Sequence, residues 1–122
     1  MALNARKQLT RGAAATSHPS PHRVPAVVAV ERLAKLAVAG APAPRMIAAA
    51  CAIVAEWRDG AMPPGMLIEQ LQALRTEIDD GLAAAEDYVA DADEADKPRA
   101  RFQLDALRAT QQVLKAEAER LP

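Results

Sequence analysis

The sequence predicts an all-α fold, a small helical bundle with a long antiparallel αα-hairpin and an extended N-terminal arm. About a quarter of the 122 residues are alanine, the best helix former, and only three residues are aromatic. Apolar residues recur at steps of three and four through the second half of the chain, and no useful length of sequence alternates like a strand. Because alanine buries little surface, we expect thin helix contacts and a domain that gains stability from a partner chain.

Residues 1–24 are expected to form a flexible basic arm ahead of the helices. This segment contains no acid, and the prolines in it favour extended or irregular backbone. Its four bases are the predicted interaction residues of the arm: Arg6, Lys7, Arg11 and Arg23. The remaining residues, 25–122, are expected to form one helical domain.

Two helices of moderate length are predicted over 25–39 and 45–58. Gly40 ends the first of them, and the APAP stretch at 41–44 forms a rigid connection to the second. The second helix contains the apolar run MIAAACAIVA. Its predicted buried residues are Ile47, Ala50, Cys51, Val54 and Trp57.

Two longer helices, predicted over 65–90 and 97–121, are expected to pack as an antiparallel αα-hairpin. Their contact is an apolar seam with coiled-coil-like spacing. The seam residues are Leu67, Leu71, Leu74, Ile78, Leu104, Leu107, Gln111 and Leu114. Gln111 is the polar interruption of the seam, and we expect it to help set the register of the two helices. Asp96 is expected to cap the last helix, with Pro98 in its first turn.

Charge is sorted along the chain. Residues 1–25 carry a net charge of +4, whereas residues 60–97 contain ten acids and two bases, a net charge of −8. The acids around the turn of the predicted hairpin form an acidic tip: Glu86, Asp87, Asp91, Asp93, Glu94 and Asp96. A calcium-binding EF-hand loop starting at Asp91 would need Gly and Glu where Asp96 and Phe102 stand. The tip is therefore predicted to be a solvated acidic loop that attracts cations without specificity.

No residues have the spacing of a catalytic or metal site. His18 and His22 are separated by prolines and lack a third ligand. Cys51 lies in an apolar run, where a thiol is inert, and as the single cysteine it excludes an internal disulfide. We therefore expect no enzymatic activity, no metal and no cofactor.

The sequence leaves three functions open. We expect a non-enzymatic structural, assembly or adaptor protein, of the kind found in bacterial or bacteriophage multi-subunit particles. It would act through helix–helix contacts and the arm, on protein partners or on other copies of itself. The alternative is a small nucleic-acid-binding regulator with a helix-turn-helix at 25–58, although its second helix has few polar side chains to read base edges. A second alternative is an acidic inhibitor in which residues 77–96 mimic nucleic acid.

A membrane-spanning helix is not expected. Such a helix needs about 20 consecutive apolar residues, and the apolar run at 46–55 is half that length. No membrane partner is therefore expected. The expected location is the cytoplasm, or the virion if the protein comes from a phage.

Overall fold

The structure is a computed structural model that describes residues 24–60 and 62–121. Its regular elements are four helices: α2 (Val24–Val38), α3 (Ala43–Asp59), α4 (Pro64–Asp91) and α5 (Lys97–Glu119). Each helix begins and ends within two residues of the range expected from the sequence, and the all-α class is confirmed. The four bases of the predicted arm, at positions 6, 7, 11 and 23, lie outside the described residues.

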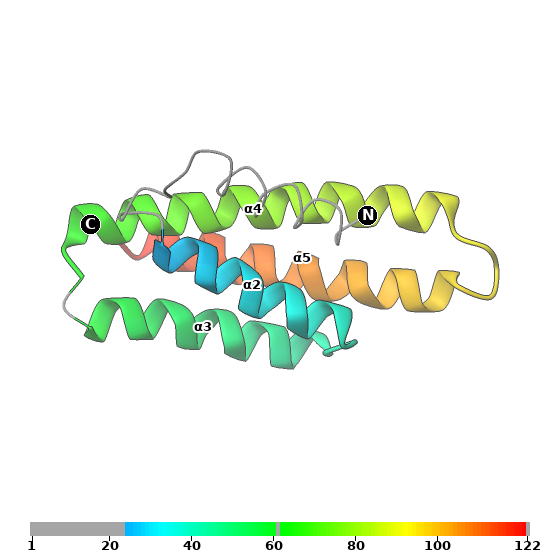
Figure 1. The fold of residues 1–122 in the computed structure, drawn as a ribbon, viewed down its shortest axis with the longest axis horizontal. Coiled ribbons are helices and arrows are strands. Elements are labelled where there is room, and N and C mark those ends of the chain that lie inside the picture. The colour runs from blue at the N-terminus through cyan, green and yellow to red at the C-terminus, as the bar shows by residue number, and fades with distance from the viewer. Residues whose placement is uncertain (1–23, 61, 122) are drawn as a thin grey trace.

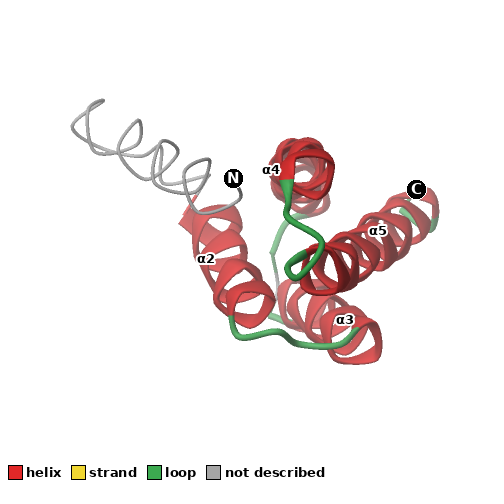
Figure 2. Cartoon of the chain, turned by 90° about the vertical axis from the view of Figure 1, so that its right-hand side faces the viewer, coloured by secondary structure: helices red, strands yellow, loops and turns green. Residues whose placement is uncertain are grey.

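The helices alternate in direction, so that α2 and α4 run one way and α3 and α5 run the other way (Figure 1). Viewed end-on, their order around the bundle is α2, α3, α5, α4 (Figure 2). The chain therefore passes from α3 to α4 across the diagonal of the bundle. As a result, α5 packs between α3 and α4, while α2 covers the remaining side of α4 and α3.

A glycine at position 40 turns the chain from α2 into α3. Gly40 has a φ of +82°, a left-handed conformation that costs a residue with a side chain about 1 to 2 kcal/mol. Its N–H donates to the Ala37 carbonyl at 3.1 Å, and the Ala41 N–H donates to the Leu36 carbonyl at 3.0 Å. These two bonds make a Schellman motif. The motif brings Ala41 into the core, where it is buried.

Proline occupies the first turn of α3, α4 and α5, where its missing N–H is not needed. Asp96 stands at the N-cap of α5, but its side chain makes no capping bond because its backbone is already helical. The predicted side-chain cap is therefore wrong. The Asp93 carbonyl instead accepts the N–H groups of Asp96 and Lys97, each at 2.9 Å, which leaves the Asp96 carboxylate exposed.

The core of the hairpin agrees with the predicted seam at its apolar positions. All seven apolar seam residues are between 0% and 7% exposed. Gln111 differs, because it is half-buried at the edge of the interface and its Nε2 donates to the Asp79 Oδ1 at 2.8 Å. The fully buried polar residues of the described chain are Gln70 and Thr110, with Glu117 only 8% exposed.

Helix α3 is rotated relative to the expectation from the sequence. Its buried residues are Met46, Ala50, Ile53 and Val54. Ile47, Cys51 and Trp57, which were expected in the core, are only partly buried. The run from 46 to 55 is apolar on every side, so the sequence contains no polar face to define the rotation. Packing against α5 and α2 defines it instead.

Candidate protein-interaction surface

The outer side of α2 is a continuous row of exposed residues. The exposed residues are separated by steps of four, four, three and three, which follow one side of a helix. They form what we call the α2 stripe: Val24, Val28, Arg32, Lys35 and Val38. Its three valines are 44%, 51% and 51% exposed. On the opposite side, α2 buries only Ala26, Ala29 and Leu33.

Two glutamines fix α2 so that the stripe faces away from the bundle. At its start, the Ala26 N–H donates to the Gln70 Oε1 of α4 at 3.1 Å, which satisfies one of the donors that a helix leaves free in its first turn. At its end, the Gln103 Nε2 of α5 donates to the Ala37 carbonyl at 3.4 Å. Gln70 is only 1% exposed, so this hydrogen bond between α2 and α4 lies in the interior of the bundle.

The outer side of α3 continues this surface with small apolar residues. Ala48, Ala52 and Ala55 are exposed, and they offer no hydrogen-bonding side chain to the edge of a base. An ion pair between the Arg32 Nη1 and the Glu56 Oε2, 3.2 Å long, joins α2 to α3. Both side chains are largely exposed, at 49% and 66%, and such pairs contribute little to stability.

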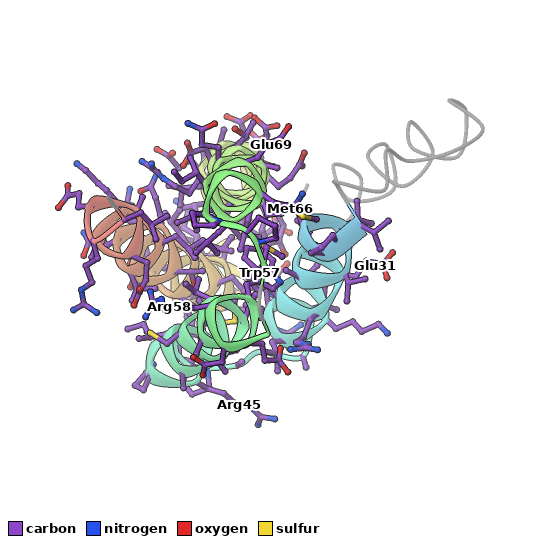
Figure 3. The ribbon with its side chains drawn as sticks, turned by 90° about the vertical axis from the view of Figure 1, so that its left-hand side faces the viewer. Glu31, Arg45, Trp57, Arg58, Met66 and Glu69 are labelled. Atoms are coloured by element: carbon purple, nitrogen blue, oxygen red, sulfur yellow. The ribbon has the colours of Figure 1, made fainter. Side chains whose placement is uncertain are left out.

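A second ion pair fastens the end of α3 to α5. The Arg58 Nη2 lies 2.9 Å from the Glu117 Oε2, and the Arg120 Nη1 lies 3.4 Å from the Glu117 Oε1. The Glu117 side chain is only 10% exposed, so its charge is held largely away from water. At the same end of the bundle, Trp57 and Met66 point inward between α2, α3 and α4 (Figure 3). Inward-pointing Trp57 and Met66 and the ion pairs of Glu117 therefore hold the helices together at this end.

The predicted acidic tip lies at the opposite end of the molecule. There, α4 and α5 extend beyond α2 and α3 and are joined by the loop at 92–96 (Figure 1). All six acids of the tip are exposed. Two of them form ion pairs, Glu94 with Lys97 at 3.4 Å and Glu86 with Arg108 at 4.0 Å.

The other acids of the tip are Asp87, Asp91, Asp93 and Asp96, and none of them forms an ion pair with another described residue. Phe102, in the second turn of α5, is 46% exposed. Sequence patterns identified the acids but not the exposed phenylalanine or the α2 stripe. The signal for the stripe was available in α2, which has valine on more sides than one bundle face can bury.

Residues 24–60 and 62–121 contain no cluster of three or more His, Cys, Asp or Glu side chains that could hold a metal ion, and no helix among them could span a membrane. Comparisons with known protein families, curated proteins and solved structures give no match.

Proposed function

We propose that this protein is a non-enzymatic structural or assembly protein that associates through the outer face of α2 and α3. The observation that carries the proposal is the α2 stripe, with three valines about half exposed on one side of one helix. Single exposed apolar residues are normal on a protein surface. Here three valines share one side of α2 with Glu31, Arg32 and Lys35, and exposed apolar side chains that gather among polar ones are typical of an interaction site.

The outer side of α4 supports this interpretation by contrast. Its exposed residues between positions 66 and 85 are Glu69, Gln72, Thr76, Asp79, Asp80 and Ala83, of which only Ala83 is apolar. The chain therefore uses ordinary solvated side chains where a helix faces water. Among the described residues, exposed valine occurs only on α2, whereas exposed alanine also occurs on α4 and α5. The three valines are therefore the property that sets the α2 face apart.

The energetics of the face suit association. Covering three half-exposed valines would contribute about 1 kcal/mol each. The alanines of α3 add little buried area, but they allow another helix to approach closely. In the sequence, the bases of the predicted arm precede Val24, the first residue of the α2 stripe. We propose that the arm extends the contact onto a neighbouring molecule.

Within this proposal the partners are proteins, and the expected setting is a multi-subunit particle of a bacterium or phage. The protein would then act in the cytoplasm or in a virion. A deletion of residues 2–23 should leave the helical circular dichroism signal nearly unchanged, because the four helices and their buried residues all lie beyond position 23. The deletion should weaken association, to which the arm is proposed to contribute. If the deletion left association unchanged, the arm would not take part in the contact.

The face itself is tested by light scattering after size-exclusion chromatography over a range of protein concentrations. Wild-type protein should be oligomeric, and Val28→Asp should shift it toward the monomer because it would bury a charge at the contact. Thr76→Asp, at an exposed position on the outer side of α4, is the matched control and should associate like the wild type.

Three results would contradict the proposal. They are a wild-type protein that is monomeric at every concentration, Val28→Asp that associates normally, and equal dissociation of the two variants. A wild-type monomer that binds a DNA duplex would replace it with the regulator hypothesis. Circular dichroism of both variants verifies that the bundle remains folded.

A further inference from the structure

Helix α2 buries fewer residues than any other described helix. Its buried residues are Ala26, Ala29 and Leu33, and the other apolar side chains that it packs against the core are only partly buried: Val30, Leu36 and Ala37. Helix α3 has 17 residues against 15 in α2, yet it buries three large apolar side chains and one alanine. Because alanine buries little surface, the packing of α2 depends mainly on leucine at position 33.

The position of α2 in the bundle makes it separable from the other helices. It lies diagonally opposite α5, between α3 and α4 (Figure 2). The two largest interfaces of the bundle are those that α5 forms with α4 and with α3, and neither of them includes α2. Both interfaces therefore remain available when α2 leaves the bundle.

The interface between α2 and α4 contains a polar group that is only partly satisfied. The Gln70 Oε1 accepts the Ala26 N–H at 3.1 Å, but the Gln70 Nε2 is buried and meets no hydrogen-bond acceptor among the described residues. A buried donor without an acceptor destabilises the closed bundle. Water would satisfy this donor, and replace the bond at Oε1, once α2 had moved away.

The remaining polar contacts of α2 are weak. The bond from the Gln103 Nε2 to the Ala37 carbonyl is 3.4 Å long, beyond the usual range for an N–H donor. The ion pair between Arg32 and Glu56 is largely exposed on both sides, and exposed pairs add little stability. Neither contact compensates for the small buried area of α2.

The boundary between α2 and α3 confines an opening to α2. Helix α2 ends at Val38, α3 begins at Ala43, and the left-handed Gly40 separates their backbone hydrogen-bond ladders. A helix of 15 residues is marginally stable in water without packing. Once released from the bundle, α2 would therefore lose its helical hydrogen bonds together.

We infer that α2 opens from the bundle as one cooperative unit while α3, α4 and α5 remain packed. Local openings of this kind use the least stable segment of a fold and cost less free energy than global unfolding. The open state uncovers Gln70 and the sides of α3 and α4 that α2 covers. The inference concerns a single molecule, so it does not depend on the proposed function.

Hydrogen exchange of the full chain in dilute solution, followed by mass spectrometry, measures the opening. After correction for intrinsic rates, the amides of residues 28–38 should share one protection factor. This factor should be at least about tenfold lower than that at the centres of α4 and α5. Helix α3 is the control for helix length, and its centre should keep the higher protection because it packs on α5.

Two alanine-to-glycine variants test whether α2 opens separately. Ala34 is half-buried in α2, and Ala83 is exposed on α4. Glycine inside a helix shifts an unfolding equilibrium about fivefold relative to alanine. Ala83→Gly should accelerate exchange at the centres of α4 and α5 by that factor and leave α2 unchanged, because α4 stays helical when α2 opens.

The matched variant in α2 should behave differently. Ala34→Gly destabilises the closed bundle relative to both the open and the fully unfolded states. Exchange should therefore accelerate by one common factor in α2 and at the centres of α4 and α5. The pair of variants distinguishes a separate opening of α2 from unfolding of the whole bundle.

Three results would overturn the inference. Equal protection in α2 and at the centres of α4 and α5 would show that the bundle opens only as a whole, and so would faster exchange of α2 in Ala83→Gly. Protection that changes gradually along residues 28–38 would indicate fraying instead of a cooperative opening. The light-scattering test of Val28→Asp is independent of these results, so the failure of one proposal is distinguishable from the failure of the other.

Discussion

The N-terminal pair of helices and the C-terminal hairpin use different chemistry to build one bundle. Helices α4 and α5 separate buried leucines from exposed charges along their length. Helices α2 and α3 are apolar on most sides, and they leave valine and alanine exposed on the outside of the bundle. The leucines of the hairpin are covered by packing between α4 and α5 and against α2 and α3, whereas the outer side of α2 and α3 leaves the apolar side chains on which the proposed association depends.

This difference teaches how far an apolar pattern determines the rotation of a helix. In α4 and α5, only one rotation buries the leucines and solvates the charges, so the pattern defines the interface. In α3, several rotations bury similar apolar area, and small differences in packing select among them. The same all-round apolar character leaves apolar side chains exposed on the outer side of α2 and α3.

The largest effect is expected at the centre of the hairpin. Leu74 is fully buried, and Leu74→Asp would place an unpaired charge in the seam. We expect a loss of more than about 4 kcal/mol, enough to unfold the domain. Thermal unfolding followed by circular dichroism measures it, with Gln72→Asp on the exposed side of α4 as the control. A normal melting temperature for Leu74→Asp would show that the hairpin is not the stabilising unit.

The rotation of α3 is tested by two isoleucines of the same helix. Ile53 is 2% exposed, so Ile53→Ala should lower the free energy of unfolding by about 2 to 5 kcal/mol. Ile47 is half-buried, and Ile47→Ala should cost clearly less. Urea unfolding of both variants gives the comparison. Equal losses, or a larger loss at Ile47, would support the rotation that the sequence suggested.

Two ion pairs differ in burial, and their removal should differ in the same direction. Glu117→Gln weakens the partly buried contact with Arg58 and should cost about 1.5 to 3 kcal/mol, the range for a hydrogen bond to a charged group. Glu56→Gln removes the exposed partner of Arg32 and should cost less than about 1 kcal/mol. Chemical unfolding at low and high salt measures both. A greater loss of unfolding free energy for Glu56→Gln than for Glu117→Gln would show that the exposed ion pair is the more stabilising one, contrary to this prediction.

The smallest effect is expected at Gln111. Its hydrogen bond to Asp79 is exposed, so Gln111→Leu should change the free energy of unfolding by less than about 0.5 kcal/mol. The oligomeric state should also remain that of the wild type. A change in oligomeric state would restore the role in register that the seam pattern suggested.

Much of the hairpin could be read from the sequence, and the outer face of α2 and α3 could not. Leu71, Leu74 and Leu114 follow a period that has one reasonable interpretation, and all three are buried. The acids of the tip were also predictable, because a charged loop between two amphipathic helices is expected to remain in water. By contrast, Val28 and Ile53 belong to segments in which almost every residue is apolar, and nothing local shows which of them is covered.

The sequence by itself determined the helical class, the approximate helix ends and the sorting of charge, because alanine content, proline, glycine and leucine spacing act over a few residues. Only the tertiary structure decided three features. Helix α5 lies between α3 and α4, Gln70 accepts a hydrogen bond from the first turn of α2, and Glu117 pairs with Arg58 at the end of α3. The hydrogen bond of Gln70 joins residues 44 positions apart in the sequence, and the bond between Arg58 and Glu117 joins residues 59 positions apart. Such contacts are selected by the packing of whole helices, and no short stretch of sequence encodes them.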